Sequence, residues 1–167
     1  MLKFIRIVSV VLLIACMVFV FCMSSQNADE SSGTSGRVIT LVLKLVYPNF
    51  EEFTAQESLK LIESLQFFVR KGAHFSIYAV MGFLSFFSVG TYTVIPFRFR
   101  LLISSVICLL YSISDEIHQT FIPGRSGELR DVCIDFCGSL VAITIMCLVV
   151  RYSKIRFFNN YFKERSQ

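Results

Sequence analysis

The chain has 167 residues, of which 54% are hydrophobic and 17% are charged, and its formal net charge is +4. A soluble domain of this length cannot hide so large an apolar share, so the composition excludes a soluble globular protein and predicts an integral membrane protein. The basic residues flank apolar segments instead of forming a separate patch, which excludes nucleic acid as a partner.

Four apolar segments have the length of a membrane-spanning helix, since about 20 residues at about 1.5 Å each cross the hydrocarbon. They cover residues 5–23, 73–95, 101–122 and 132–150. The first could instead be a signal peptide, but no small-residue cleavage pattern follows Met23. We therefore predict an all-α integral membrane protein, a four-transmembrane-helix bundle that forms a single domain over residues 1–167.

The segment between the first two spans, residues 24–71, is predicted as one long loop region. Residues 24–36 are rich in Ser and Gly and are predicted to be irregular, and residues 37–47 are apolar but too short to cross a membrane. Residues 54–68 have apolar side chains at helical spacing, which predicts an amphipathic helix that continues into the second span. Residues 96–100 are predicted as a short basic turn.

The distribution of charge predicts the orientation. If both termini lie on one side, that side carries nine basic residues and one acid, whereas the opposite side carries seven basic and eleven acidic residues. The positive-inside rule then puts both termini in the cytoplasm, with residues 24–71 outside. The basic residues of the terminal side are Lys3, Arg6, Arg98, Arg100, Arg151, Lys154, Arg156, Lys163 and Arg165.

All six cysteines lie in apolar segments, where a thiol behaves as a small hydrophobic group. We therefore predict free thiols and no disulfide. They are Cys16, Cys22, Cys108, Cys133, Cys137 and Cys147.

Polar and charged side chains lie near the outer ends of the last three spans, at similar depths if each residue rises about 1.5 Å. Within each span they recur at intervals of three or four residues and so share one face. Charges at such a depth are costly and are usually paired or functional. We predict one pocket that binds a ligand, formed by Arg70, Lys71, His74, Tyr78, Asp115, Glu116, Gln119, Arg125, Asp131 and Asp135.

Within this pocket the guanidinium groups are suited to an anionic headgroup, because they form forked hydrogen bonds to phosphate. The acids would orient these bases or receive ammonium groups. We expect a carboxylate of Asp115 or Glu116 to bond a basic residue of the set. Gly138, on the same face as Asp135, would allow a neighbouring helix to approach closely.

Three ordered motifs, RKGAHFSIY, SDEIHQTFIPGR and RDVCIDFCG, resemble the VanZ family of bacterial membrane proteins. The family pattern is a basic pair before a His and a Tyr, an acidic pair followed by Gln, Pro and Arg, and two Asp before a Gly. The matching residues are Arg70, Lys71, His74, Tyr78, Asp115, Glu116, Gln119, Pro123, Arg125, Asp131, Asp135 and Gly138.

The resemblance covers essentially the whole chain and includes the SSQ that follows the first span. It implies reduced susceptibility to glycopeptide antibiotics of the teicoplanin type, exerted at the cell envelope. It implies no chemical mechanism. Where the family has an Asn-type residue shortly before the last Gly, this chain has Phe136 or Cys137, so no amide role is carried over.

Three functions remain open from the sequence. The chain can engage a membrane lipid or a lipid-linked cell-wall precursor, or it can be a membrane-embedded enzyme with Asp115 or Glu116 as base and His74 as acid. It can also be a structural membrane protein whose charges fix helix register. We predict no cofactor and no metal, because Asp115, Glu116 and His118, with His74 nearby, match no standard ligand spacing and no phosphate-binding loop is found.

Overall fold

The computed structural model describes residues 2–47, 49–92 and 94–152, and these residues are helical apart from the turns between helices. The elements are α1 (Leu2–Ser24), α2 (Ala28–Val46), the short 3-10 helix η1 (Phe50–Glu52), α3 (Ala55–Gly90), α4 (Phe97–Gln119) and α5 (Leu129–Tyr152). Of these, α1, α3, α4 and α5 are long and apolar enough to cross a membrane. The chain is therefore a multi-pass membrane protein with a bundle of four spanning helices, as predicted.

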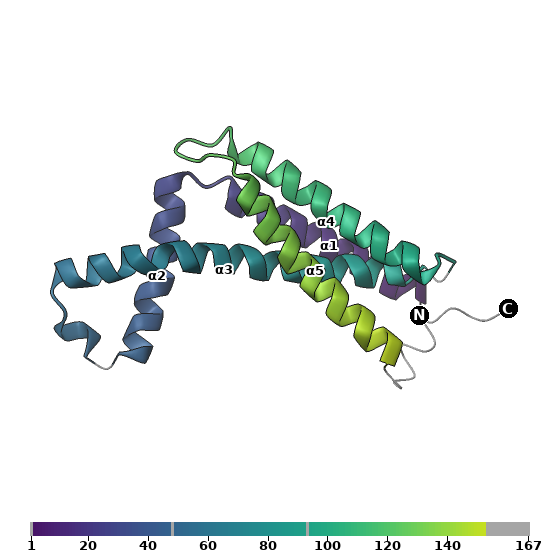
Figure 1. Ribbon diagram of the computed structural model, residues 1–167, viewed down its shortest axis with the longest axis horizontal. Helices are drawn as coiled ribbons and strands as arrows, with labels where there is room; N and C mark the ends of the chain where they lie inside the picture. The colour runs from purple at the N-terminus through teal and green to yellow at the C-terminus, as the bar shows by residue number, and fades with distance from the viewer. Residues whose placement is uncertain (1, 48, 93, 153–167) are drawn as a thin grey trace.

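The central helix of the bundle is α3, which contacts α1, α2, α4 and α5 and packs most extensively against α5 (Figure 1). At one end of the bundle α1 begins, α5 ends and α3 turns into α4. At the other end α1 and α4 finish and α5 begins, and we call this end, marked by Ser24, Gln119 and Leu129, the loop end. The first half of α3 extends beyond the bundle and packs against α2.

The interior of the bundle combines apolar and small polar side chains. Tyr78, Met81 and Phe86 on α3 are completely buried, and they belong to one cluster with residues of α1, α4 and α5. Many large apolar side chains on the outside of the bundle are exposed, as expected for helices that face lipid. All six cysteines lie among the described residues and are free thiols, as predicted.

Two glycines let α3 and α5 approach closely. A Cβ atom on Gly138 would lie 2.3 Å from the carbonyl oxygen of Phe75, and one on Gly82 would lie 2.4 Å from that of Ser139. Small residues at helix crossings allow such backbone contact in membrane proteins. The predicted role of Gly138 is confirmed, and Gly82 supplies the reciprocal contact from α3.

The prediction of an irregular segment over residues 24–36 is wrong, because α2 begins at Ala28. The helix starts with a capping box: the side chain of Asn27 accepts the backbone N–H of Glu30 at 2.8 Å, and the Glu30 carboxylate accepts the backbone N–H of Asn27 at 3.2 Å. The hydroxyl groups of Thr34 and Ser35 donate to carbonyls of the preceding turn. These local bonds stabilise a helix in a Ser- and Gly-rich sequence that composition alone assigns to a loop.

The predicted basic turn at residues 96–100 is also wrong, since α4 begins at Phe97 and α3 already ends at Gly90. Arg100 is completely buried, and its Nε donates to the carbonyl oxygen of Ile95 at 2.7 Å. The predicted amphipathic helix over residues 54–68 is confirmed as the first part of α3. Of the basic residues assigned to the side of the termini, Lys154, Arg156, Lys163 and Arg165 lie outside the described residues.

Candidate functional site

The ten predicted site residues come from three helices and the loop that joins α4 to α5. Each helix presents its members at helical spacing, so that they share a face. The set comprises Arg70, Lys71, His74 and Tyr78 on α3, Asp115, Glu116 and Gln119 on α4, Arg125 in the loop, and Asp131 and Asp135 on α5.

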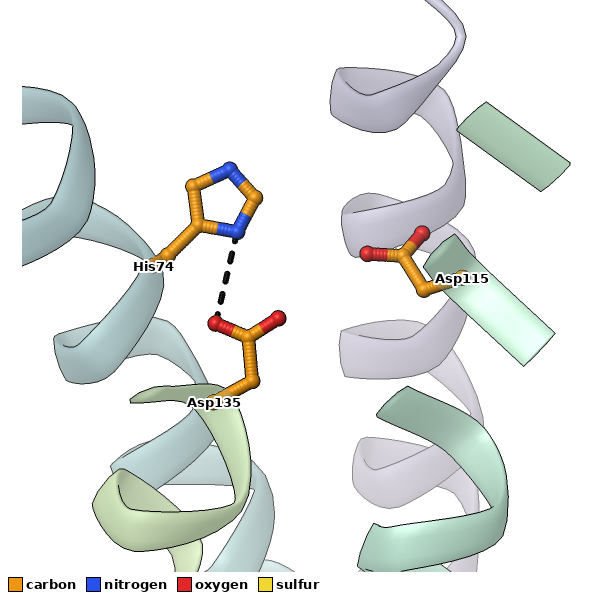
Figure 2. A group of neighbouring side chains, drawn as sticks. All are labelled: His74, Asp115 and Asp135. Atoms are coloured by element: carbon orange, nitrogen blue, oxygen red, sulfur yellow. Dashed lines mark ion pairs between the residues drawn. The ribbon is translucent and has the colours of Figure 1, made fainter. Parts of the chain in front are cut away.

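The innermost part of the site lies between α3, α4 and α5, and Figure 2 shows three of its side chains. Nδ1 of His74 lies 3.4 Å from Oδ1 of Asp135, and the carboxylate of Asp115 faces this pair from the other side. The hydroxyl group of Tyr78 donates to Oδ2 of Asp115 at 3.1 Å. Tyr78 and Asp135 are completely buried and Asp115 nearly so, whereas the His74 side chain is 28% exposed and lines a neighbouring cavity.

The loop after α4 is held by two buried side chains of that helix. Oε2 of Glu116 accepts the backbone N–H of Glu128 at 2.8 Å. The amide nitrogen of Gln119 donates to Asp115 and to Glu116, each at 3.4 Å, and its oxygen accepts from Nη1 of Arg125 at 3.2 Å. The loop therefore keeps Arg125 against the end of α4.

Two ion pairs lie at the start of α5. Nζ of Lys71 bonds both carboxylate oxygens of Asp131 across the α3–α5 contact, and the two side chains are only 22% and 16% exposed. Arg130 bonds Glu128 at 2.7 Å, but these side chains are 59% and 42% exposed. The first pair is the better shielded of the two, so breaking it is expected to cost more than breaking the second.

The pairing of charges differs from the one expected from the sequence. Asp115 and Glu116 accept hydrogen bonds from neutral donors, namely a phenol, an amide and a backbone N–H, and from no basic side chain in the described part of the chain. Lys71 and His74 on α3 pair instead with acids of α5. The cause is the close α3–α5 crossing, which places each of these two basic residues opposite an acid.

Two cavities meet at Arg70 and Arg125, which line both. The first has a volume of about 260 Å³, lies between α1, α2 and α3, and has mainly apolar walls. The second has a volume of about 340 Å³, lies between α3, the loop and α5, and has mainly polar walls. An apolar space thus borders a polar one, with two guanidinium groups at the boundary.

Neither guanidinium forms an ion pair with a carboxylate of the described residues. Nε of Arg125 is buried without a hydrogen-bond partner. Burial lowers the pKa of Arg125, the neighbouring charge of Arg70 lowers it further, and Asp115 and Glu116 offset part of this effect. Two adjacent cations with spare donors favour an anion between them.

Some features of this site have no counterpart in the predictions. Helix α2 forms one wall of the apolar cavity through Thr34, Ser35 and Val38. Part of this helix falls in the segment that the sequence predicts as irregular. The N-x-x-E pattern at Asn27 is a capping box that could have revealed this helix. Ser139 was also missed, although its hydroxyl group donates to the carbonyl oxygen of Tyr78 at 3.0 Å.

The three acid–base candidates, His74, Asp115 and Glu116, do not lie together in one group. His74 and Asp115 face the same space, but the carboxylate of Glu116 bonds the loop. His118 lies apart from them, since its ring stacks on Phe21 at 4.5 Å and its Nε2 lies 3.1 Å from the hydroxyl group of Ser25.

Comparison with known families agrees with this arrangement. A family model described as VanZ/LLP1 matches residues 9–150, which include all ten site residues and both glycines of the α3–α5 crossing. No curated protein and no solved structure matches the chain. Since the match extends from the first spanning helix to the last, the chain belongs to the VanZ/LLP1 family.

Proposed function

We propose that the chain lowers susceptibility to glycopeptide antibiotics of the teicoplanin type by engaging a lipid-linked component of the bacterial cell envelope. The ligand lies at the loop end, which faces the outside of the cytoplasmic membrane. Its anionic headgroup contacts Arg70 and Arg125. The family match supports the link to glycopeptides, and the properties of the two cavities support a lipid.

The observation that carries this proposal is the junction of an apolar and a polar cavity at two arginines. A lipid-linked precursor has the same order of parts: a hydrocarbon tail, a phosphate and a polar head. The tail fits the space between α1, α2 and α3, and the head fits the space beside the α4–α5 loop. The phosphate then lies between the guanidinium groups, which bind phosphate oxygens through forked hydrogen bonds.

The charges around the polar cavity support an anion over a cation. Three acids line it, of which Asp131 and Glu128 are paired with Lys71 and Arg130. Arg70 and Arg125 are not paired with any described acid, and with Glu63 counted the lining residues still carry one positive charge in excess. A bound phosphate would compensate it in a partly desolvated place, where such compensation is worth most.

The test is a double variant, Arg70→Gln with Arg125→Gln, expressed in glycopeptide-sensitive cells. We expect it to abolish the rise in the inhibitory concentration of teicoplanin while the protein reaches the membrane at normal abundance. Arg37→Gln is the matched control, since this exposed arginine of α2 lines neither cavity. Full resistance in the double variant would refute the proposal.

A second variant examines the tail site without changing any charge. Val38 is half exposed and lines the apolar cavity, so Val38→Trp is expected to fill that space with little effect on folding. Mass spectrometry of lipid that copurifies with the protein should show less polyisoprenyl phosphate than wild type. An unchanged lipid content together with unchanged resistance would show that the cavity is not used.

The orientation has its own prediction. Cysteines introduced at Asp29 and Ser126, both exposed and at the loop end, are expected to react with a membrane-impermeant maleimide added outside intact cells. A cysteine at Arg98, exposed at the opposite end, is expected to react only after lysis. The parent for all three should have its native cysteines replaced by serine or alanine. Labelling of the Arg98 position from outside would reverse the orientation and place the site in the cytoplasm.

A further inference from the structure

Three potential ligand atoms converge at the centre of the site. One nitrogen of His74, one carboxylate oxygen of Asp115 and one of Asp135 all lie within 4.8 Å of one another, and each comes from a different helix. Figure 2 shows the carboxylate of Asp115 directed at the space beside the His74–Asp135 pair. Such a constellation does not appear as a motif in the sequence, because the three residues lie 20 to 61 positions apart in the chain.

A second, independent feature is that this space contains polar atoms without hydrogen bonds. Asp135 is completely buried, and neither of its carboxylate oxygens has a hydrogen-bond partner among the described residues. Nδ1 of His74 is also buried without one, although it lies at ion-pair distance from Asp135. A buried carboxylate is stable only with a cation or with hydrogen-bond donors.

Apart from His74, no basic side chain of the described residues forms an ion pair with Asp115 or Asp135. Lys71 bonds Asp131, and Arg125 donates to Gln119. The cluster of two acids and one imidazole therefore retains an excess of negative charge that protein cations do not neutralise. A divalent cation would supply the missing charge and satisfy the buried oxygens in one step.

We propose that His74, Asp115 and Asp135 bind a divalent first-row metal ion such as Zn²⁺ or Mn²⁺. One imidazole and two carboxylates form a mixed donor set that suits these ions better than Mg²⁺ or Ca²⁺, which prefer oxygen alone. Donors at 2.0–2.2 Å from a tetrahedral ion lie about 3.3–3.6 Å apart, and the His74–Asp135 distance is 3.4 Å. Asp115 needs only a small approach to complete the set.

The surroundings resemble those of other metal sites. The hydroxyl group of Tyr78 and the amide of Gln119 both donate to Oδ2 of Asp115, which leaves Oδ1 for the ion and fixes the orientation of the carboxylate. His74 also lines the apolar cavity, which provides a route into the site. This inference is independent of the proposed function, because a metal can bind with or without a lipid.

The test uses the full chain purified in detergent, stripped with EDTA and titrated with Zn²⁺ or Mn²⁺. We expect one high-affinity ion per chain by calorimetry, with Mg²⁺ binding far more weakly. Asp135→Asn and His74→Gln are each expected to weaken binding more than about 100-fold, and Tyr78→Phe about 10- to 100-fold, as for a group that orients a ligand.

Two matched controls exclude general effects of losing a histidine or an acid. His118→Gln removes a ring that stacks on Phe21, and Asp29→Asn removes an exposed acid of α2 that lines neither cavity, so both should leave the affinity unchanged. Zinc X-ray absorption on the wild-type protein needs no variant and should show one nitrogen and two oxygen ligands from the chain. Absence of saturable Zn²⁺ and Mn²⁺ binding, or equal affinity in Asp135→Asn, would overturn the metal site without touching the lipid proposal.

Discussion

Replacing Gly138 by alanine is expected to destabilise the folded protein strongly, because the new Cβ atom would lie 2.3 Å from the carbonyl oxygen of Phe75. That atom belongs to the α3 backbone and cannot rotate away, so α3 and α5 must separate. Overpacking of a well-packed interior costs about 1–3 kcal/mol, and movement of a helix backbone places this change at the upper end. Gly82→Ala should behave alike, since its Cβ would meet the carbonyl oxygen of Ser139.

The matched control is Gly72→Ala on the same helix as Gly82. A Cβ atom on Gly72 would have no atom within 4 Å, and the residue is exposed. Alanine is a better helix former than glycine by about 1 kcal/mol, so this variant should be neutral or more stable. The measurement is unfolding in detergent by circular dichroism, with heat or sodium dodecyl sulfate. Equal stability of Gly138→Ala and Gly72→Ala would show that the α3–α5 crossing is looser than described.

Replacing Lys71 by alanine is the second change with a large expected effect. It would leave Asp131 without its partner, and the Asp131 side chain is only 16% exposed. Removing one member of a fully buried ion pair costs about 3–5 kcal/mol, because the remaining charge stays desolvated and unpaired, so about 3 kcal/mol is the upper end for this partly buried pair. The same unfolding assay measures the loss, and it should be visible as a lower midpoint.

Two further variants distinguish the loss of the Lys71–Asp131 ion pair from the loss of packing by the Lys71 side chain. Arg130→Ala breaks the pair with Glu128, whose members are 59% and 42% exposed, and should cost less than about 1 kcal/mol. The charge swap Lys71→Asp with Asp131→Lys should recover much of the stability lost in Lys71→Ala. If Arg130→Ala costs as much as Lys71→Ala, or if the swap recovers nothing, the ion pair does not stabilise the α3–α5 contact.

Much of the fold could be predicted from the sequence because its physical cause is local. The length and apolarity of a spanning helix are set by the thickness of the hydrocarbon, so α1, α3, α4 and α5 appear as runs of apolar residues. The residues that share a helix face also follow from spacing alone, as for His74 and Tyr78. Gly138 was identified because a glycine beside polar residues in a span is typical of a helix crossing.

The sequence by itself thus determined the spans, the stripes of polar residues and the family, whereas only the tertiary structure decided which charges meet. Whether Asp115 pairs with a cation or with Tyr78 depends on how α3, α4 and α5 are rotated and how close they lie. Because α3 and α5 lie close together, Lys71 and His74 pair with acids of α5. The same contact places Asp135 beside His74 and Asp115. The apolar cavity likewise needs α2, whose position depends on packing against α3. These contacts join residues distant in the chain, and their energies depend on geometry between helices that no local pattern encodes.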